Sequence, residues 1–411
     1  MRYHGIRPHH ALPAMYCIAF GVYGTLLPFL PLILREGGLS DVDVSLALSA
    51  MGLAAIVSPM LMAYFADAKY PLRRILTAMF LFAAALNPLW LVVSDVFGAF
   101  CLTFAIFGVF IPALSCLDAF TIKLTQIAHH ADSVGTKATF QGIRRWGSFG
   151  FIIPTVIFAL YESGQEATGT LIFIGTILTL ASALIALLLP HNAPVTAGKN
   201  APSIAALKFA FSSSLRSIIY GTGLAGIALS IFFVVFPRYL QELGASPSTI
   251  GLITVIGVLW EMLLFPYAQR LVARFGIHRV ILIGVLSLPL RLIPLALYPS
   301  LHLAVALQFL HAPVIVAMML CVPMLLGECS EERFRFSLQG IYTVISFGIA
   351  RLLGPIIVAP ILSYFAETPL LALRIVLVIG GIIAGLGALF LVSPTNRLKY
   401  TLNIRGISKV R

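Results

Sequence analysis

Apolar residues fill twelve stretches of this chain, and charged residues gather in the short gaps between them. A helix rising 1.5 Å per residue needs about 20 apolar residues to cross a bilayer, and each stretch has about that length. The expected spans are 13–34, 45–66, 75–93, 97–120, 141–160, 169–189, 217–237, 248–266, 280–298, 303–326, 339–363 and 371–393. The pattern predicts an all-α membrane protein with 12 transmembrane helices.

Composition and charge support a membrane protein and argue against a nucleic-acid partner. Hydrophobic residues make up 60% of the chain and charged residues only 10%, against about 25% charged in soluble domains. The net charge is +12, but with the N-terminus inside, nearly all Lys and Arg fall in tails and inner loops, with Arg35 and Arg238 in outer loops. This positive-inside distribution predicts a multi-pass protein of the plasma membrane, here a bacterial inner membrane, with both termini cytoplasmic.

The two halves of the chain contain an internal repeat. Five residues recur 206 positions later: Pro31, Leu34, Glu36, Gly38 and Ser40 return as Pro237, Leu240, Glu242, Gly244 and Ser246. The expected division is a six-helix bundle at 1–189, a cytoplasmic linker at 190–216, a second six-helix bundle at 217–393 and a cytoplasmic tail at 394–411. A same-direction repeat predicts two bundles related by an axis along the membrane normal, with a shared cavity between them.

That architecture resembles the major facilitator superfamily, and the segment 63–74 resembles its signature between helices two and three. The signature is Gly-x-x-x-Asp followed by basic residues, and here Ala63 replaces the Gly. The resemblance implies that Asp67 and Arg73 help to hold one closed conformation. The alternative is that Asp67 is a solvated loop carboxylate.

Ionisable residues inside the spans are candidates for the site, since each costs about 2.5–3.5 kcal/mol at mid-bilayer. Counting helical rise places Arg291, His311 and Arg351 about 12–13 Å below the outer surface, and Glu261 about 20 Å below it. A lone Glu near an Arg can bind and release a proton reversibly, so Glu261 is the leading proton carrier. Alternatively, Glu261 and Arg291 only hold two helices together, and His311 bonds a backbone carbonyl.

Two short motifs resemble the lactose permease branch of the superfamily, especially its relatives for phenylpropionate-type acids and nucleosides. Leu117-Asp118-Ala119-Phe120 resembles the acidic motif of helix four, and residues 142–148 resemble the Gly-x-x-Arg-x-aromatic-Gly motif of helix five. The resemblance implies that Asp118 and Arg144 bind substrate, and that Phe151 takes the place of a Trp that stacks on sugar. The alternative is that both charges snorkel at the cytoplasmic interface.

Arg291 and His311 match the Arg and His of that permease's proton machinery. Its proton-carrying Glu follows the His by three residues, where this chain has Val314. Proton coupling therefore requires Glu261 or Asp118 to carry the proton.

Together these features predict a secondary active transporter that takes up a small polar or anionic organic solute with a proton. Aromatic acids, nucleosides and sugars are candidates, and Arg351 is a candidate anchor for an anionic group. The alternatives are a proton-driven exporter of the same fold and a non-transporting receptor or scaffold. We expect a monomer with no cofactor other than the coupling proton.

An enzyme and a metal site are both disfavoured by the sequence. No nucleophile and base pairing appears, which argues against catalysis. His129, His130 and Asp132 lie in a polar stretch without a further nearby ligand, so no metal site is expected.

Overall fold

The computed structural model is helical almost throughout the residues it describes, which are 8–67, 71–130, 140–161, 167–189, 204–211, 215–329 and 335–392. Within these residues, 11 helices are long and apolar enough to cross a membrane, and counting one bent pair as a span gives 12. The predicted all-α fold with twelve spans is therefore confirmed.

The described part of the first half contains seven α-helices and one 3-10 segment. They are α1 (Pro8–Leu26), α2 (Leu30–Glu36), α3 (Asp41–Asp67), α4 (Leu72–Leu86), η1 (Asn87–Leu91), α5 (Val96–His130), α6 (Phe140–Tyr161) and α7 (Ala167–Ala186). The first span bends by 44° between α1 and α2. Pro28 lies at this break, and proline interrupts a helix because it lacks the N–H donor.

The second half has more broken helices. It contains α8 (Ile204–Ala210), α9 (Arg216–Glu242), α10 (Pro247–Leu264), η2 (Phe265–Tyr267), α11 (Ala268–Phe275), α12 (Ile277–Leu297), α13 (Leu301–Ala306), η3 (Leu307–Leu310), α14 (His311–Ile315), η4 (Val316–Cys321), α15 (Val322–Cys329), α16 (Arg335–Thr343), η6 (Val344–Ile349), α17 (Ala350–Tyr364) and α18 (Pro369–Val392). η4 and η6 are π-helical, a conformation that often marks functional sites.

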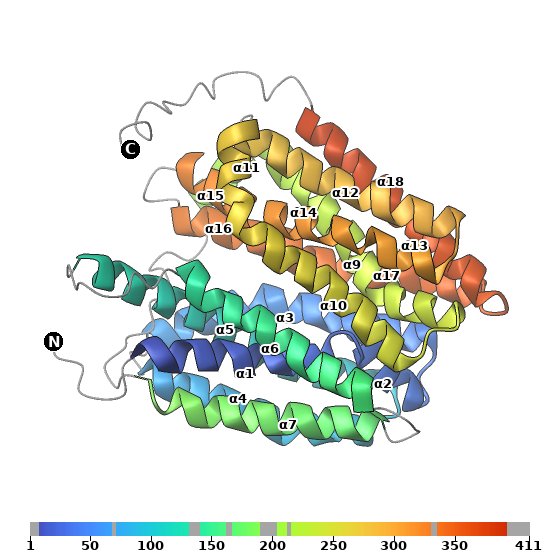
Figure 1. The fold of residues 1–411 in the computed structure, drawn as a ribbon, viewed down its shortest axis with the longest axis horizontal. Helices are drawn as coiled ribbons and strands as arrows, with labels where there is room; N and C mark the ends of the chain where they lie inside the picture. Colours follow the sequence, from blue (N-terminus) through green and yellow to red (C-terminus); the bar gives the residue numbers. More distant parts are fainter. Residues whose placement is uncertain are drawn as a thin grey trace.

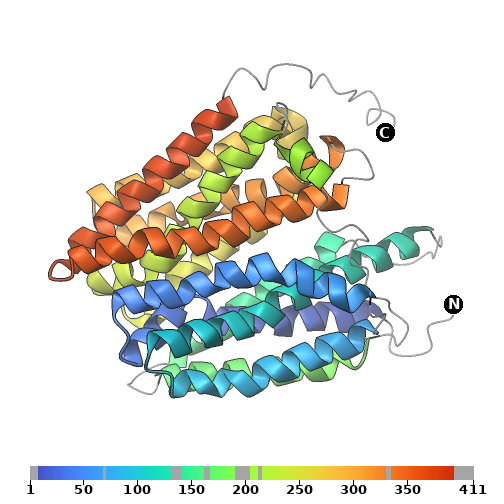
Figure 2. The ribbon, with the colours of Figure 1, turned by 180° about the vertical axis from the view of Figure 1, so that it is seen from behind.

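The helices form two bundles, α1–α7 and α9–α18, that lie side by side (Figure 1). The start of α1 and the end of α18 lie at the same end of the molecule, called here the terminal end. The two bundles approach each other at the opposite end and diverge toward the terminal end, as both views show (Figures 1 and 2). Across the boundary, α3 packs against α17 and α6 packs against α10.

Glycines permit close backbone contact both within and between the bundles. A Cβ added to Gly150 of α6 would lie 1.8 Å from the Cys17 carbonyl oxygen of α1, and one on Gly52 of α3 would lie 2.1 Å from the Leu352 nitrogen of α17. Membrane helices associate mainly through such close packing, because the surrounding lipid is as apolar as their side chains. Any side chain at these positions would push the helices apart.

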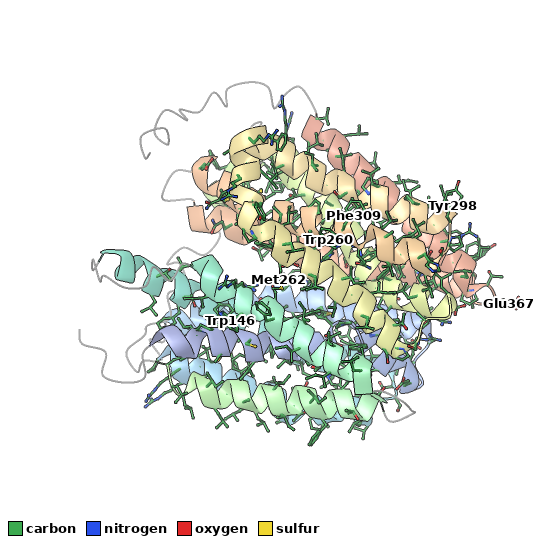
Figure 3. All side chains as sticks on the ribbon, viewed as in Figure 1. Trp146, Trp260, Met262, Tyr298, Phe309 and Glu367 are labelled. Atoms are coloured by element: carbon green, nitrogen blue, oxygen red, sulfur yellow. The ribbon has the colours of Figure 1, made fainter. Side chains whose placement is uncertain are left out.

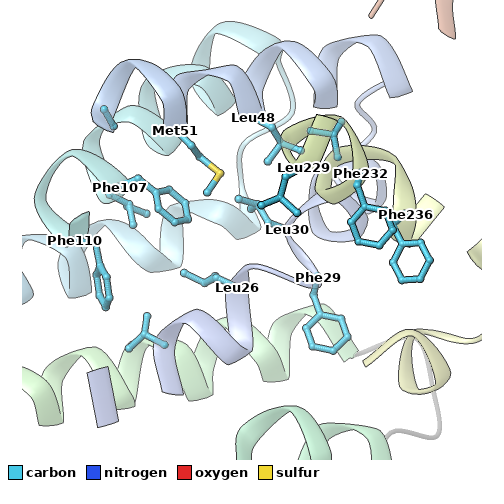
Figure 4. Packing of buried hydrophobic residues seen from close by; sticks show 14 of the residues in the cluster. Leu26, Phe29, Leu30, Leu48, Met51, Phe107, Phe110, Leu229, Phe232 and Phe236 are labelled. Atoms are coloured by element: carbon cyan, nitrogen blue, oxygen red, sulfur yellow. The ribbon is translucent and has the colours of Figure 1, made fainter. Parts of the chain in front are cut away.

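A single cluster of buried apolar residues extends through both bundles. Leu30 of α2, Leu48 of α3 and Leu229 of α9 belong to it (Figure 4). The outer surface is also apolar, since Phe97 is 74% exposed and Leu160 is 72% exposed. A surface of this kind is stable when hydrocarbon rather than water surrounds it.

Two sequence-based placements differ from the structure. Arg35 and Arg238 were predicted in outer loops, but Arg35 lies in the last turn of α2 and Arg238 lies inside α9, four residues before its end. Their charges are paired with carboxylates there, so the helices continue past the apolar stretches that defined the predicted spans. Part of the predicted linker, α8, is helical.

Candidate functional site

Asp118 of α5 and Arg144 of α6 form an ion pair in the first bundle. Arg144 Nε lies 3.4 Å from Asp118 Oδ1, and the Tyr16 hydroxyl of α1 donates a hydrogen bond to the same oxygen at 2.5 Å. The sequence pointed to the pair but missed Tyr16. The structure thus unites three helices around one carboxylate, and we call Tyr16, Phe20, Asp118 and Arg144 the first cluster.

The Arg144 guanidinium also lies over aromatic rings of α1. Its central carbon is 4.1 Å from the Phe20 ring centre and 5.6 Å from that of Tyr16, which is favourable cation–π geometry. The side chains of Arg144 and Asp118 are 35% and 36% exposed. The pair is therefore held firmly yet remains accessible to a solute.

A half-exposed aromatic stripe continues along α1 toward the other bundle. Phe20 and Tyr23 are half-buried although Ala19, Val22 and Thr25 between and beside them are buried. Tyr23 packs edge-on against Phe110 with ring centres 5.0 Å apart. Arg144 and Arg351 of the other bundle both lie within electrostatic range of Tyr23.

Phe151 and Arg351 lie near this region, but their predicted solute contacts stay predictions. Phe151 follows Arg144 by seven residues on α6, which places both on one face of the helix. Phe151 and Arg351 are both half-buried. Arg351 lies on α17 immediately after η6.

The second bundle holds a chain of four polar residues, called here the second cluster. Arg291 of α12 contacts His311 Nδ1 through Nη1 at 3.3 Å, and its Nη2 donates to Gln308 Oε1 at 2.6 Å. On the far side of the imidazole, His311 Nε2 lies 3.9 Å from Glu261 Oε2 of α10. His311 therefore separates Glu261 from Arg291.

Arg291 is only 1% exposed, and no carboxylate among the described residues forms an ion pair with it. Its guanidinium carbon lies 3.9 Å from the Phe232 ring centre and 5.5 Å from that of Phe236. Glu261 and Arg291 therefore form no direct ion pair with each other but are connected through His311, and the alternative that they only hold helices together stays a prediction. The positive charge is held by aromatic faces and neutral acceptors instead.

Glu261 was predicted to lie a turn or more deeper than His311, yet the two side chains are neighbours. The 3-10 segment η3 immediately precedes His311. A 3-10 segment rises about 2.0 Å per residue instead of about 1.5 Å, so four residues carry His311 about 2 Å deeper than a regular helix would. The helix also starts at Leu301, two residues before the predicted span, which adds about 3 Å of depth. Counting along a straight helix cannot detect this break.

The helices that carry Arg144 and Glu261, α6 and α10, pack against each other across the bundle boundary. Glu261 interacts electrostatically with Arg144 of the first bundle. Its neighbour Trp260 is 46% exposed on the lateral surface (Figure 3), whereas the Glu261 side chain is 21% exposed. The two clusters together contain acidic, basic and aromatic groups from α1, α5, α6, α10, α12 and α14.

A network of charged and amide side chains joins the bundles at the opposite end. Asp41 of α3 binds Arg35 at 2.9 Å and Arg238 of α9 at 3.3 Å, while Arg238 also pairs with Glu242. Arg35 donates to Gln241 Oε1 at 3.0 Å, and these two residues occupy equivalent repeat positions. We call these five residues the opposite-end network; the sequence analysis did not predict it as a gate.

The gating pair expected from the superfamily signature stays a prediction. Asp67 ends α3, but its side chain lies outside the described part of the chain. Arg73 is half-buried on α4 and forms no ion pair with another described residue. His129 and His130 end α5, but their side chains and Asp132 also lie outside the described part. Among the side chains that are described, no group of three potential ligands could hold a metal ion.

Sequence comparisons relate most of this chain to transporters. The profile of the MFS_1 like family matches residues 9–366. YwbF of Bacillus subtilis (strain 168), described as an uncharacterized transporter, is 26% identical over 77% of each chain. YegT of Escherichia coli (strain K12), described as a proposed nucleoside transporter, is 25% identical over 68% of this chain and 66% of its own.

Solved structures share the fold. The nucleoside transporter NupG superposes with a TM-score of 0.79 at 19% identity, covering 94% of this chain and 98% of its own. A bacterial homolog of the human lysosomal transporter Spinster, in an inward-facing and unoccupied conformation, superposes with a TM-score of 0.69 at 14% identity, covering 93% and 95%.

Proposed function

We propose that this chain, which belongs to the MFS_1 like family of the major facilitator superfamily and is a transporter, works by secondary active transport and takes up a ring-bearing polar solute together with a proton. The observation that carries the proposal is the placement of Arg144. Its guanidinium is half-exposed, paired with Asp118, stacked on Phe20 and within electrostatic reach of Glu261 in the other bundle. One residue thus links a solute site to a proton site.

The first cluster supplies the solute site. Arg144 offers several N–H donors in a planar fork, which suits carboxylates, carbonyls and hydroxyl groups. Beside it, Phe20 and Tyr23 offer aromatic faces on which a flat ring can stack. These groups favour a nucleoside or an aromatic acid over a sugar, and YegT and NupG, whose names refer to nucleoside transport, support a nucleoside as the first solute to test.

The second cluster supplies the proton site. Glu261 is a carboxylate in water-poor surroundings, and His311 and Arg291 lie in line behind it. Protonation of Glu261 would remove the negative charge that faces Arg144, and Arg144 would then be freer to bind solute.

The opposite-end network supports a state that is closed at one side. Ion pairs and close packing join the bundles at this end, while the bundles diverge toward the terminal end (Figure 1). By the positive-inside rule the terminal end is cytoplasmic, in the plasma membrane of a bacterium. The structure then corresponds to an inward-facing state, and uptake requires the opposite-end network to open.

The test is solute-induced proton movement in vesicles containing the purified protein, screened over nucleosides, aromatic acids and sugars. We expect wild type to move protons with its solute, and Glu261→Gln to exchange labelled solute without proton movement. Glu367→Gln is the matched control, because Glu367 is exposed at the opposite end (Figure 3). The proposal fails if Glu261→Gln still moves protons like wild type, or if no solute of these classes is transported.

A further inference from the structure

An apolar groove lies on the lateral face of the second bundle, away from both clusters. It has a volume of about 340 Å³ and lies between α9, η6 and α18. Figure 2 shows α9 between α17 and α18 on this face. Its lining includes Gly223, Leu224 and Ile227 of α9, Ile345 and Ile349 of η6, and Phe390 of α18. No residue proposed to bind solute or proton lines it.

One face of α9 connects this groove to a basic residue at the terminal end. Arg216, Tyr220, Gly223 and Ile227 are spaced by four, three and four residues, which places them along a single helix face. Arg216 is exposed at the start of α9, and no carboxylate of the described residues pairs with it. The groove therefore has a cationic group at its mouth and apolar walls beyond.

Aromatic rings surround the mouth of the groove. Tyr220 is 45% exposed and lies between Phe211 and Phe390, with ring centres 5.6 Å and 5.8 Å away. Exposed aromatic residues with one polar group favour the boundary between hydrocarbon and headgroups. Their position indicates that Arg216 lies at the level of the headgroups.

The length of the face fits one leaflet. Eleven residues separate Arg216 from Ile227, which corresponds to about 16 Å along the helix. The hydrocarbon core of a bilayer is about 30 Å thick, so the face extends about halfway across it. An acyl chain that begins at headgroup level would follow this face to the bilayer midplane.

We propose that this groove is a binding site for an anionic membrane phospholipid, with one acyl chain along α9 and the phosphate bound by Arg216. Guanidinium groups bind phosphate oxygens through two parallel hydrogen bonds. Anionic lipids are concentrated in the cytoplasmic leaflet, where the terminal end would lie. This proposal does not depend on the identity of the solute or on proton coupling.

The test is native mass spectrometry of the full chain, with phosphatidylglycerol and phosphatidylcholine of identical acyl chains added in equal amounts. We expect wild type to retain phosphatidylglycerol several-fold better. Arg216→Gln should reduce its retention to that of phosphatidylcholine, because the phosphate partner is lost but the groove remains. Leu224→Trp should reduce retention of both lipids, because the indole fills the groove.

Matched controls separate this site from general membrane affinity. Arg270→Gln removes an exposed Arg of α11, and Leu290→Trp adds an indole to the lateral face of α12, where Leu290 is 60% exposed; both should behave as wild type. If Leu224→Trp does not fold, Ile349→Trp fills the groove from its other wall. The proposal is overturned if wild type retains the two lipids equally. It is also overturned if the control variants lose as much lipid retention as Arg216→Gln and Leu224→Trp do. A dimer that Leu224→Trp dissociates would instead assign the groove to a second copy of the chain.

Discussion

The first and second clusters both hold an Arg over a Phe ring, but within the part of the chain that the structure describes the Arg has a carboxylate partner only in the first. Arg144 lies 4.1 Å from the Phe20 ring centre and pairs with Asp118. Arg291 lies 3.9 Å from that of Phe232, and its polar partners among the described residues are Gln308 and His311. Arg144 is also about one-third exposed, while Arg291 is buried. The same pair of side-chain types therefore occurs in two electrostatic environments.

The difference indicates a division of labour. An Arg that is paired and accessible can give some of its N–H groups to a solute while the carboxylate still balances its positive charge. A buried Arg without a carboxylate partner leaves an uncompensated positive charge, which is costly in a low-dielectric region. That charge favours an ionised carboxylate nearby, and Glu261 lies just beyond His311. The first cluster thus suits binding, and the second suits control of a proton.

The largest effect should come from Arg144→Ala. A hydrogen bond to a charged group is worth about 1.5–3 kcal/mol, so solute affinity should fall by about 10- to 150-fold. Equilibrium binding of labelled solute to purified protein measures this loss. Arg145→Ala is the matched control, because Arg145 is adjacent but exposed. Unchanged affinity in Arg144→Ala would place the solute elsewhere and remove the contrast between the clusters.

The fold was largely predictable because it depends on patterns that repeat over about 20 residues. Span number, their approximate positions and the internal repeat follow from apolar length and from residues such as Pro31 and Pro237. The ends of the helices were less predictable, since α5 continues to His130 and α9 continues to Glu242. Polar residues can extend a helix beyond the membrane, and hydropathy carries no signal for that extension.

The candidate site was predictable only where charge inside a span is unusual. Asp118, Arg144, Glu261 and Arg291 stood out because an apolar stretch rarely contains ionisable residues. Tyr16 and Gln308 did not stand out in the sequence, because uncharged polar residues are common in membrane helices. Only the fold shows what these two side chains contact. The spacing of Tyr16, Phe20 and Tyr23 along one helix face was the available signal for the aromatic stripe.

A smaller effect is expected from changes at Gln308, which test why Arg291 lacks a carboxylate. Gln308→Leu removes the acceptor of the 2.6 Å hydrogen bond and should destabilise the protein by about 1–3 kcal/mol, measured by thermal unfolding. Gln308→Glu should keep the fold but neutralise Arg291, making the second cluster resemble the first. Solute-induced proton movement should then weaken while solute binding persists.

The control for this pair is Gln269→Leu, a change of the same type at an exposed position of α11. It should alter neither thermal unfolding nor proton movement. If Gln308→Glu moves protons as well as wild type does, the unpaired charge of Arg291 is irrelevant, and the proposed division of labour between the clusters is wrong.

The smallest effect should come from Asp41→Asn. This change weakens the opposite-end network, which holds together the two bundles that carry the clusters. Asp41 bridges Arg35 and Arg238, whose side chains are 30% and 18% exposed. Partly exposed ion pairs contribute about 0.2–1 kcal/mol each, so the loss of both should raise the open population at this end about 2- to 30-fold. The open population is measured as the rate at which an impermeant maleimide labels a single Cys placed at Val234, in a background without other cysteines.

Asp43→Asn is the matched control, because Asp43 lies in the same helical turn but its carboxylate hydrogen-bonds only Ser40 among the described residues. Labelling should rise in Asp41→Asn and not in Asp43→Asn, and added salt should reduce the difference, since ions screen partly exposed pairs. Equal labelling in the two variants would mean that apolar packing alone closes this end. In that case the opening needed for uptake would depend on helix contacts such as that of Gly52 with α17. The ion pairs would then contribute nothing measurable to holding this end closed.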